Sequence, residues 1–346
     1  MTRVRVRTEK IRRFILERVE ESPKDLAKAT SAKFGITRQA VNKHLRRLLA
    51  EGVLRRSGNT RAAVYRLAPL SQWDTTCRIE PGLAEDVVWM REVRDVLGDL
   101  PDNALEIWQY GFTEMFNNAI DHADGTHIGV RIKKTAASTE MMIHDDGYGI
   151  FRKIQTALGL LDARHAILEL SKGKLTTDPA HHTGEGIFFS SRMFDGFDIL
   201  SEGVFFSHKF EDSRDWIMEG DRKSKGTAVW MKLSNHTARS TKRIFDQYTS
   251  GNDFGFTKTV VPVRLAQYGE DKLISRSQAR RVLARIELFE TVLFDFTEVT
   301  AIGQAFADEI FRVFVMRHPE IELVPIHANP ETERMIARAK RGSERR

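Results

Sequence analysis

The N-terminal part of the chain carries apolar side chains at the spacing of amphipathic helices. The pattern predicts three helices, over residues 8–21, 22–35 and 37–52, and the last of them has Thr37 as an N-cap. Two short strand patterns then flank a Ser-Gly-Asn turn, which predicts a β-hairpin over residues 53–67. This segment is therefore expected to form a small unit of three helices and a hairpin.

The hydrophobic pattern changes twice further along the chain. Residues 69–81 contain two prolines and few apolar side chains, so we interpret them as a connector. Residues 82–250 mix helical and strand patterns, and residues 256–340 alternate helices with apolar strands, as expected for an α/β layer. We predict a multidomain α/β protein with units at 1–68, 82–250 and 256–340.

The composition is that of a globular protein in a reducing, aqueous compartment. Hydrophobic residues make up 41% and charged residues 29% of the chain. No apolar run reaches the roughly 18 residues that span a bilayer, and the N-terminus lacks the apolar core of a secretory signal. One cysteine, Cys77, allows neither an internal disulfide nor a zinc cluster. We expect a cytoplasmic location and no membrane contact.

The net charge of +6 conceals an asymmetry between the segments. Residues 1–68 contain 18 Lys and Arg against 6 Asp and Glu, whereas the rest of the chain contains 36 against 42. Only the first segment is electrostatically suited to a polyanion.

Three helices followed by a hairpin resemble a winged helix-turn-helix domain, most specifically over residues 34–54. With Val41 and Leu45 turned inward, the third helix presents side chains that can reach base edges and phosphates in a major groove. These side chains are Arg38, Gln39, Asn42, Lys43 and Arg46. The residues expected at the phosphate backbone are Arg55, Arg56 and Arg61 of the wing. The resemblance implies DNA as a partner, and a winged helix used for protein contacts is the alternative.

Residues 106–123 predict a helix with two different faces. The apolar face consists of Trp108, Phe112, Met115 and Ala119, and should pack on a sheet. Glu114, Asn118 and Asp121 lie on a second face. A carboxylate and an amide four residues apart can meet a metal-bound phosphate together, because one can orient water while the other offers an oxygen to Mg²⁺.

Three glycine-containing turns follow this helix. Asp145, Gly147 and Gly149 come after a strand, where glycine permits close approach of a ligand and a carboxylate can accept from an exocyclic amine. Residues 183–186 contain two glycines and open a helix, which makes a seat for phosphate. Residues 225–230 enter another strand.

In this order, the four elements resemble the GHKL ATPase superfamily, which includes gyrase B, the mismatch-repair L protein, heat-shock chaperones, sensor kinases and anti-sigma serine kinases. The resemblance implies a mixed sheet covered by helices, with ATP and Mg²⁺ as cofactors. Asn118 would coordinate Mg²⁺, Asp145 would bind the adenine amine, and Thr227 would support the adenine from the far side. The other residues implied at the nucleotide are Asp121, Gly147, Gly149, Thr183, Gly184, Glu185 and Gly186.

The same resemblance makes residues 151–183 an ATP lid, with Lys172 and Lys174 as phosphate contacts. Glu114 occupies the position at which hydrolysing members carry their general base, which favours turnover. The alternative is an ordinary buried helix whose Glu and Asn have structural partners. A sensor histidine kinase fits poorly, because the helix predicted over residues 83–97 contains no histidine.

The C-terminal segment resembles STAS domains, and most closely a STAS-like variant fused to GHKL ATPases. An apolar strand over residues 291–297 leads through a turn into a helix, and a strand and a helix follow. STAS domains of the anti-anti-sigma type place a phosphorylatable Ser at this turn, where this chain has Gly303-Gln304. Thr297 and Thr300 lie close by. A packing module without chemistry is the favoured interpretation, and a protein partner is the alternative.

The leading functional hypothesis is an ATP-dependent regulator that combines a DNA reader, a GHKL switch and a STAS-like interaction domain. Closing of the lid would change domain packing or homodimer formation, and with it the binding of DNA. Two alternatives remain open from sequence: an anti-sigma-type protein serine/threonine kinase, and a stress or phage-defence sensor driven by ATP turnover.

Overall fold

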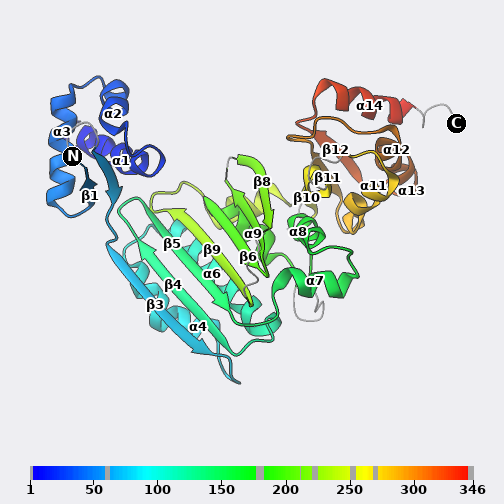
Figure 1. The fold of residues 1–346 in the computed structure, drawn as a ribbon, viewed down its shortest axis with the longest axis horizontal. Coiled ribbons are helices and arrows are strands. Elements are labelled where there is room, and N and C mark those ends of the chain that lie inside the picture. The colour runs from blue at the N-terminus through cyan, green and yellow to red at the C-terminus, as the bar shows by residue number, and fades with distance from the viewer. Residues whose placement is uncertain are drawn as a thin grey trace.

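The computed structural model describes residues 3–58, 63–176, 183–210, 212–219, 225–249, 255–267 and 272–341. They form a multidomain α/β protein (Figure 1), with a helical unit at the N-terminus, a large sheet backed by helices, and a smaller α/β unit at the C-terminus.

The N-terminal unit contains three helices and a two-stranded antiparallel hairpin. Its elements are α1 (Arg3–Glu21), α2 (Leu26–Phe34), α3 (Arg38–Ala50), β1 (Leu54–Ser57) and β2 (Val64–Leu67). The N-cap prediction is confirmed, since the Oγ1 atom of Thr37 accepts a hydrogen bond from the Ala40 N–H at 3.2 Å. Ile15, Val41 and Leu45 are buried in one hydrophobic cluster, as their spacing predicts.

The stretch interpreted as a connector contains a strand. β3 (Ser71–Arg78) pairs with β4 (His127–Lys134) along its whole length, from Ser71 opposite Lys134 to Arg78 opposite His127. Its exposed and half-buried positions alternate strictly, which is the pattern of an edge strand with one solvated face. The large sheet therefore begins within residues 69–81, and the connector interpretation is wrong for this strand.

The large sheet has the order β3-β4-β5-β9-β6-β7-β8, and every described pairing in it is antiparallel. It differs in this respect from the mixed sheet that the sequence led us to expect. The remaining strands are β5 (Ser138–Asp145), β6 (Gly196–Ser201), β7 (Val204–Lys209), β8 (Asp212–Glu219) and β9 (Thr227–Ser234). β5 and β9 occupy the middle, so the turns at their ends are held by neighbours on both sides.

Helices lie behind this sheet, and α7 (Ile150–Leu158) and α8 (Ala163–Lys172) lie between it and the C-terminal unit (Figure 1). The other helices of this unit are α4 (Glu85–Val88), η2 (Trp89–Val93), α5 (Arg94–Leu97), α6 (Asp102–His122), α9 (Gly186–Met193) and α10 (Thr241–Gln247). The predicted apolar face of α6 is confirmed, because Trp108, Phe112, Met115 and Ala119 are all at most 4% exposed.

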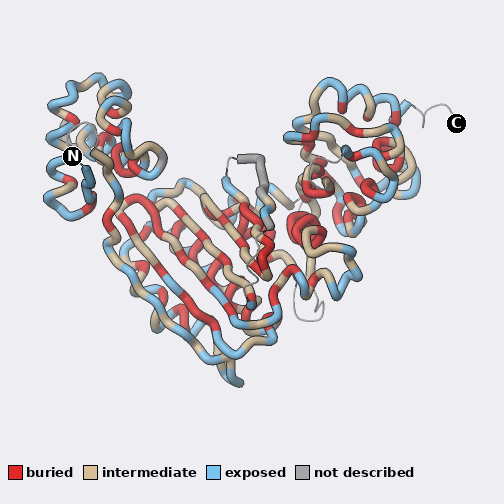
Figure 2. The backbone as a smooth tube through the Cα atoms, viewed as in Figure 1, coloured by how far each residue is buried: buried red, intermediate tan, exposed pale blue. Residues whose placement is uncertain are grey.

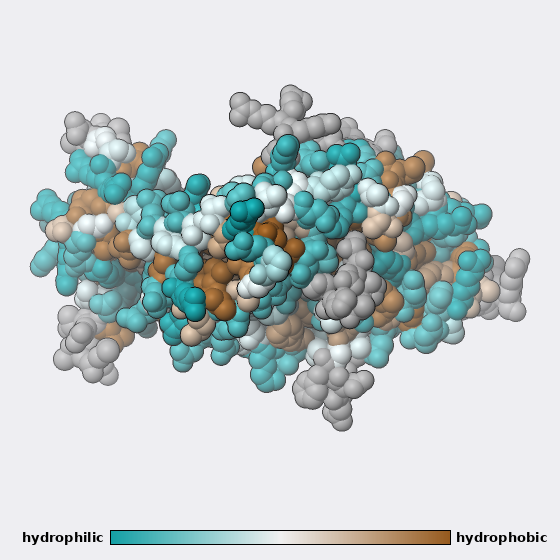
Figure 3. All heavy atoms as spheres, turned by 90° about the horizontal axis from the view of Figure 1, so that it is seen from below, coloured by the Kyte–Doolittle hydropathy of each residue, from teal (hydrophilic) through white to brown (hydrophobic). Residues whose placement is uncertain are grey.

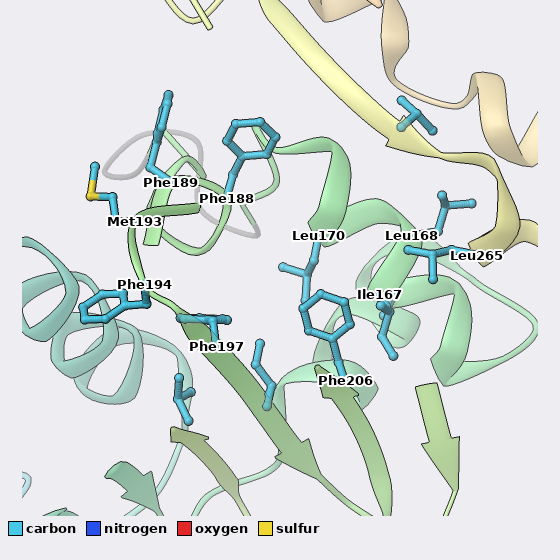
Figure 4. Close-up of a cluster of buried hydrophobic side chains, with 14 of the residues drawn as sticks. Ile167, Leu168, Leu170, Phe188, Phe189, Met193, Phe194, Phe197, Phe206 and Leu265 are labelled. Carbon is cyan, nitrogen blue, oxygen red and sulfur yellow. The ribbon is translucent and has the colours of Figure 1, made fainter. Parts of the chain in front are cut away.

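The core continues from the large sheet into the C-terminal unit without a break. Buried and half-buried positions alternate along the strands (Figure 2). Figure 4 shows the part of the core built by α8, α9, β6 and β7, where Leu265 of the C-terminal unit lies beside Ile167 and Leu168 of α8.

The C-terminal unit is built on a parallel three-stranded sheet with the order β10-β11-β12. Its elements are β10 (Lys258–Pro262), η3 (Val263–Ala266), α11 (Arg276–Leu283), η4 (Ile286–Leu288), β11 (Thr291–Asp295), α12 (Gln304–Asp308), η5 (Glu309–Phe314), α13 (Val315–Arg317), β12 (Glu322–Ile326) and α14 (Pro330–Arg341). The predicted alternation of strands and helices is confirmed.

Seen from below, much of the visible surface is hydrophilic, and apolar side chains show in several separate patches along the molecule (Figure 3). None of the helices that the structure describes combines the length and the apolar character needed to cross a bilayer.

We predict that Phe194→Ala lowers the free energy of unfolding by about 3–5 kcal/mol, the usual cost of emptying a buried aromatic site. The Phe194 ring is fully buried, and its centroid lies 4.8 Å from that of Trp108. Urea unfolding followed by tryptophan fluorescence measures the change. Leu161→Ala is the control, because Leu161 is 90% exposed and should shift stability by less than about 0.5 kcal/mol. Equal losses in the two variants would contradict this packing.

Candidate nucleotide site

A cavity of about 300 Å³ opens between α6, the turn after β5, α7, α8 and the start of α9. Four groups that the sequence singled out line it together: Glu114 and Asn118 of α6, Asp145 at the end of β5, residues 183–186 before and at the start of α9, and Thr227 at the start of β9. Segments separated by more than a hundred residues thus meet around one hollow.

Asp145 lies at the inner end of the cavity and is 9% exposed. Its Oδ1 atom accepts hydrogen bonds from the Gly147 N–H at 2.9 Å and the Thr227 N–H at 3.2 Å. Burial raises the pKa of this carboxyl, while these two backbone N–H groups lower it. Since both recorded bonds use Oδ1, the second oxygen can accept from a ligand.

The neighbouring carboxylate, Asp146, has a different role. It accepts hydrogen bonds from the N–H and the hydroxyl of Thr126 and from the His127 N–H, so it fixes the turn before β4. These bonds hold the pKa of Asp146 far below its usual range. Of the two adjacent acids, Asp145 is therefore the one that serves the cavity.

Thr227 joins the two central strands to the helix behind the cavity. Its N–H donates to Asp145, and its Oγ1 atom accepts from the Ile150 N–H at 2.9 Å, at the start of α7. The side chain thereby satisfies one of the N–H groups that a helix start leaves unpaired. The orientation of Asp145 and the start of α7 are fixed by the same residue.

Glu114 faces the opposite wall of the cavity, where α9 begins. A Cβ atom added to Gly186 would lie 2.0 Å from the Glu114 Oε2 atom, so a larger residue at 186 would displace the carboxylate. Gly184 has φ = +71°, and a Cβ there would meet the backbone of Leu175 at 2.4 Å. The two glycines thus permit a close contact and a left-handed turn, respectively.

Two carboxylates share this wall. Burial raises the pKa of Glu114, and the charge of Glu185 raises it further. Burial also raises the pKa of Glu185, whereas the Lys174 ammonium lowers it. Burial and both acids raise the pKa of the Tyr110 hydroxyl, one helical turn before Glu114. The wall is therefore negatively charged and partly buried. Binding of a proton or a cation would reduce the repulsion between the two carboxylates.

Several predicted site residues lie elsewhere. Asp121 is exposed and is not part of the cavity lining, although its neighbour His122 is, because successive residues of a helix point in different directions about its axis. Gly147 and Gly149 shape the turn around Asp145 without lining the cavity. These residues support the site from outside or do not belong to it, contrary to the expectation that they line the nucleotide.

The two lysines proposed as phosphate contacts face the C-terminal unit. The Lys172 ammonium is fully buried and donates to the Glu169 carboxylate at 2.7 Å and to the backbone carbonyls of Arg281 and Ala284 at 2.9 and 2.8 Å. Lys174 donates to the Leu288 carbonyl at 2.9 Å. The phosphate prediction is wrong for Lys172 in this arrangement, and Lys174 has another partner here.

The lid expectation needs the same correction. Residues 151–172 form α7 and α8, and Ile154, Ala166, Ile167 and Leu168 are at most 4% exposed. A segment with so many buried apolar side chains is part of the core and is not a lid that swings in water. Residues 177–182 lie outside the described residues.

The sequence did not reveal four polar residues that also line the cavity, namely Asn117, His122, Lys153 and Thr176. The Lys153 ammonium donates to the His122 carbonyl at 2.7 Å and to the Asp124 carboxylate at 2.8 Å. Lys153 is the one Lys or Arg among the described lining residues. The sequence contained one sign that Lys153 belongs to the site. Lys153 lies in the first turn of α7, immediately after the glycine turn that follows Asp145.

The oxygen atoms that line the cavity suit Mg²⁺ only when a phosphate-bearing ligand supplies further oxygens. Among the described residues, no three His, Cys, Asp or Glu side chains converge as a metal cluster. Glu114, Asn117 and Asn118 nevertheless present carboxylate and amide oxygens in one cavity. This matches the usual protein contribution to Mg²⁺ bound through phosphates, which is one or two oxygen ligands.

The predicted DNA-contacting side chains that the structure describes are all exposed on the N-terminal unit. They are Arg38, Gln39, Asn42, Lys43 and Arg46 of α3 and Arg55 and Arg56 of β1. Figure 1 shows α3 on the side of this unit that faces away from the large sheet. Arg61 lies outside the described residues.

In the C-terminal unit, the turn that contains Gly303-Gln304 precedes α12, as predicted. The Thr297 hydroxyl donates to the Asp295 carboxylate at 2.7 Å, and the His327 ring lies 3.0 Å from the same oxygen. Thr300 is exposed. Thr297 therefore caps the turn after β11.

Comparison with known proteins gives one family match. Residues 278–333 match the family described as STAS-like domain of unknown function (DUF4325). A comparison with curated proteins finds no match. The match covers α11 to the start of α14, so the C-terminal unit is STAS-like, as the sequence led us to expect.

Proposed function

We propose that this chain is an ATP-binding and ATP-hydrolysing regulatory protein that couples a nucleotide pocket to a DNA-binding winged helix and to its STAS-like domain. The observation that carries the proposal is the geometry of Asp145, a buried carboxylate with one oxygen fixed by two backbone N–H groups. Asp145 lines a cavity that is also lined by a glycine turn and two further acids, Glu114 and Glu185.

The inner part of the cavity suits a flat heteroaromatic base. Met115, Ile143, Ile154, Leu170 and Val229 give it apolar walls. A carboxylate oxygen between such walls accepts from an exocyclic amine, and it repels a carbonyl oxygen at the same place. This combination favours adenine over guanine, whose corresponding position carries a carbonyl.

The outer part suits phosphates. The turn at residues 183–186 leads into α9, and the first N–H groups of a helix attract an anion. Lys153 supplies a positive charge in the lining. Since Glu114 and Glu185 are negative, a triphosphate would need Mg²⁺ beside this wall, and the oxygens of Glu114, Asn117 and Asn118 are the ones placed to hold it.

Glu114 is the group that we assign to hydrolysis. The bound metal would supply charge that stabilises the phosphate oxygens. Glu114 would orient a water molecule and accept its proton, and a raised pKa makes a carboxylate a better base near neutral pH. Asn118, one helical turn further along α6, would hold the metal side of the same wall.

We predict that Asp145→Ala weakens binding of a non-hydrolysable ATP analogue roughly ten- to hundredfold, because it removes a charge-assisted hydrogen bond of about 1.5–3 kcal/mol. Isothermal titration calorimetry on the full chain measures the affinity. Asp74→Ala is the control, since Asp74 is an exposed carboxylate on the edge strand β3. Unchanged affinity in a folded Asp145 variant would refute the pocket assignment.

Glu114→Gln should keep nucleotide binding and lower turnover about 10²–10⁴-fold, the usual contribution of a general base. In the wild type, the hydrolysis rate should fall as the pH drops through the raised pKa of Glu114. Glu185→Gln removes a charge that raises this pKa, so the acid limb should move to lower pH. Glu80→Gln, at an exposed position, should leave the profile in place.

Release of inorganic phosphate and labelling of protein, followed in parallel with labelled ATP, distinguish an ATPase from a kinase. Equal hydrolysis by the wild type and the Glu114 variant would contradict the catalytic role. The chain would then be a nucleotide-binding module.

Duplex DNA binding by the full chain should weaken steeply with salt, because lysines and arginines displace condensed counterions. Arg55→Ala should weaken all sequences alike and lower the salt slope by about one, whereas Arg38→Ala should relax sequence preference. Fluorescence anisotropy at several salt concentrations measures both effects. Arg317→Ala removes an exposed charge from the C-terminal unit and serves as the control. Equal effects of all three variants would contradict a DNA surface on α3 and β1.

A further inference from the structure

The STAS-like unit is fixed to α8 by a buried polar network. Lys172 donates to Glu169 of its own helix and to two carbonyls at the end of α11. Arg285 donates to the second oxygen of Glu169 at 3.0 Å, and its other nitrogen donates to the carbonyls of Gly173 and Lys174. Glu169 is therefore held between a lysine of α8 and an arginine of the STAS-like unit.

Aromatic packing surrounds this network. Phe256, just before β10, lies against Phe188 and Phe189 of α9, with ring centroids 4.5 and 4.9 Å away. It also contacts Phe289 of the STAS-like unit at 5.1 Å. The two units thus share a continuous core, which excludes water from the charged groups between them.

The segment that receives these contacts is also a wall of the nucleotide cavity. Leu170, Leu175 and Thr176 line the cavity. The Leu175 N–H donates to the Gly184 carbonyl at 3.0 Å, which connects this wall to the proposed phosphate turn. Arg285 therefore lies on one side of a thin stretch of backbone whose other side faces the cavity.

The backbone of this stretch is strained at Lys174. Gly173 and Lys174 have φ values of +80° and +50°, and Arg285 itself has +63°. Glycine adopts a positive φ without strain, whereas a lysine does so only where surrounding contacts determine it. Here the determining contacts are the hydrogen bonds from the Arg285 guanidinium to the carbonyls of these same two residues.

We propose that the STAS-like domain regulates the nucleotide pocket by holding the wall at residues 173–176 through Arg285. The inference rests on the proposed ATP site and adds its regulation. With Arg285 in place, the wall and the Gly184 turn are preformed for a ligand. When a protein partner binds the STAS-like domain and separates it from α8, the segment at residues 173–176 relaxes. The pocket then loses affinity for the nucleotide. By linkage, nucleotide in the pocket strengthens the docking of the domain by the same factor.

The test uses the full chain and a non-hydrolysable ATP analogue with Mg²⁺. Arg285→Gln should weaken its binding roughly 5- to 150-fold, the usual range of coupling between sites. Arg280→Gln is the matched control, because Arg280 lies on α11 of the same domain and pairs with Glu309 within it, at 2.9 Å. It should change the affinity less than about twofold. Far-UV circular dichroism checks that both variants are folded.

Hydrogen exchange on the wild type gives a second readout that does not depend on a variant. Saturating nucleotide should slow exchange of the amides in residues 276–289, which lie outside the cavity lining. Equal affinities of Arg285→Gln and wild type, or unchanged exchange in residues 276–289 upon binding, would overturn the coupling and leave the ATP site standing. Absence of nucleotide binding by the wild type would instead refute the proposed function itself.

Discussion

The structure depends on the packing of α6 against the large antiparallel sheet. One side of this helix buries Trp108, Phe112 and Met115, and burial of such side chains contributes about 1.5–3 kcal/mol each. This fixes the rotation of the helix about its axis. Glu114 and Asn118 can then face only the hollow between α6 and α9. The packing of the apolar face of α6 thus determines where its polar face lies. A shift of α6 by one residue would misplace both faces.

The same packing sets the electrostatics of the cavity. Glu114, Glu185 and Asp145 are held where burial raises the pKa of each. Lys172 and Lys174, which are close in sequence, point instead toward the STAS-like domain. Three acids thus line the cavity side of the stretch at residues 173–176, and both of these lysines lie on its other side. A cationic or metal-bearing ligand is favoured on the cavity side, and carbonyls satisfy the ammonium groups on the other.

The sequence predicted features that depend on neighbouring residues better than features that depend on distant ones. Helix periodicity identified the two faces of α6, and turn chemistry identified Thr37 and the glycines at 184 and 186, because these signals lie within a few neighbouring residues. The strand β3 was missed because an edge strand with one solvated face has few apolar residues. The role of Lys172 could not be foreseen, since its partners are carbonyls more than a hundred residues away. The resemblance to a known superfamily suggested a mobile lid there, whereas packing against the STAS-like domain makes it core.

The large sheet and its helices contact the other two units through different kinds of charged contact. The STAS-like domain meets α8 through buried charges, and breaking such a pair typically costs about 3–5 kcal/mol. The N-terminal unit meets the sheet through the buried Ala137, which packs in the hydrophobic cluster of that unit, and through Glu20. The Glu20 carboxylate accepts from the Ser138 hydroxyl and pairs with Lys232, both at 2.7 Å, in a partly exposed contact. Pairs of that kind contribute about 0–1 kcal/mol. Yet Ser138 begins the strand that ends at Asp145, and Lys232 lies on the strand that begins at Thr227. Two rigid central strands therefore connect the proposed pocket to the proposed DNA reader. In the coupling that we propose, the partly exposed ion pair of Glu20 would respond to a small shift of those strands, and the buried charges at α8 would hold the wall of the pocket.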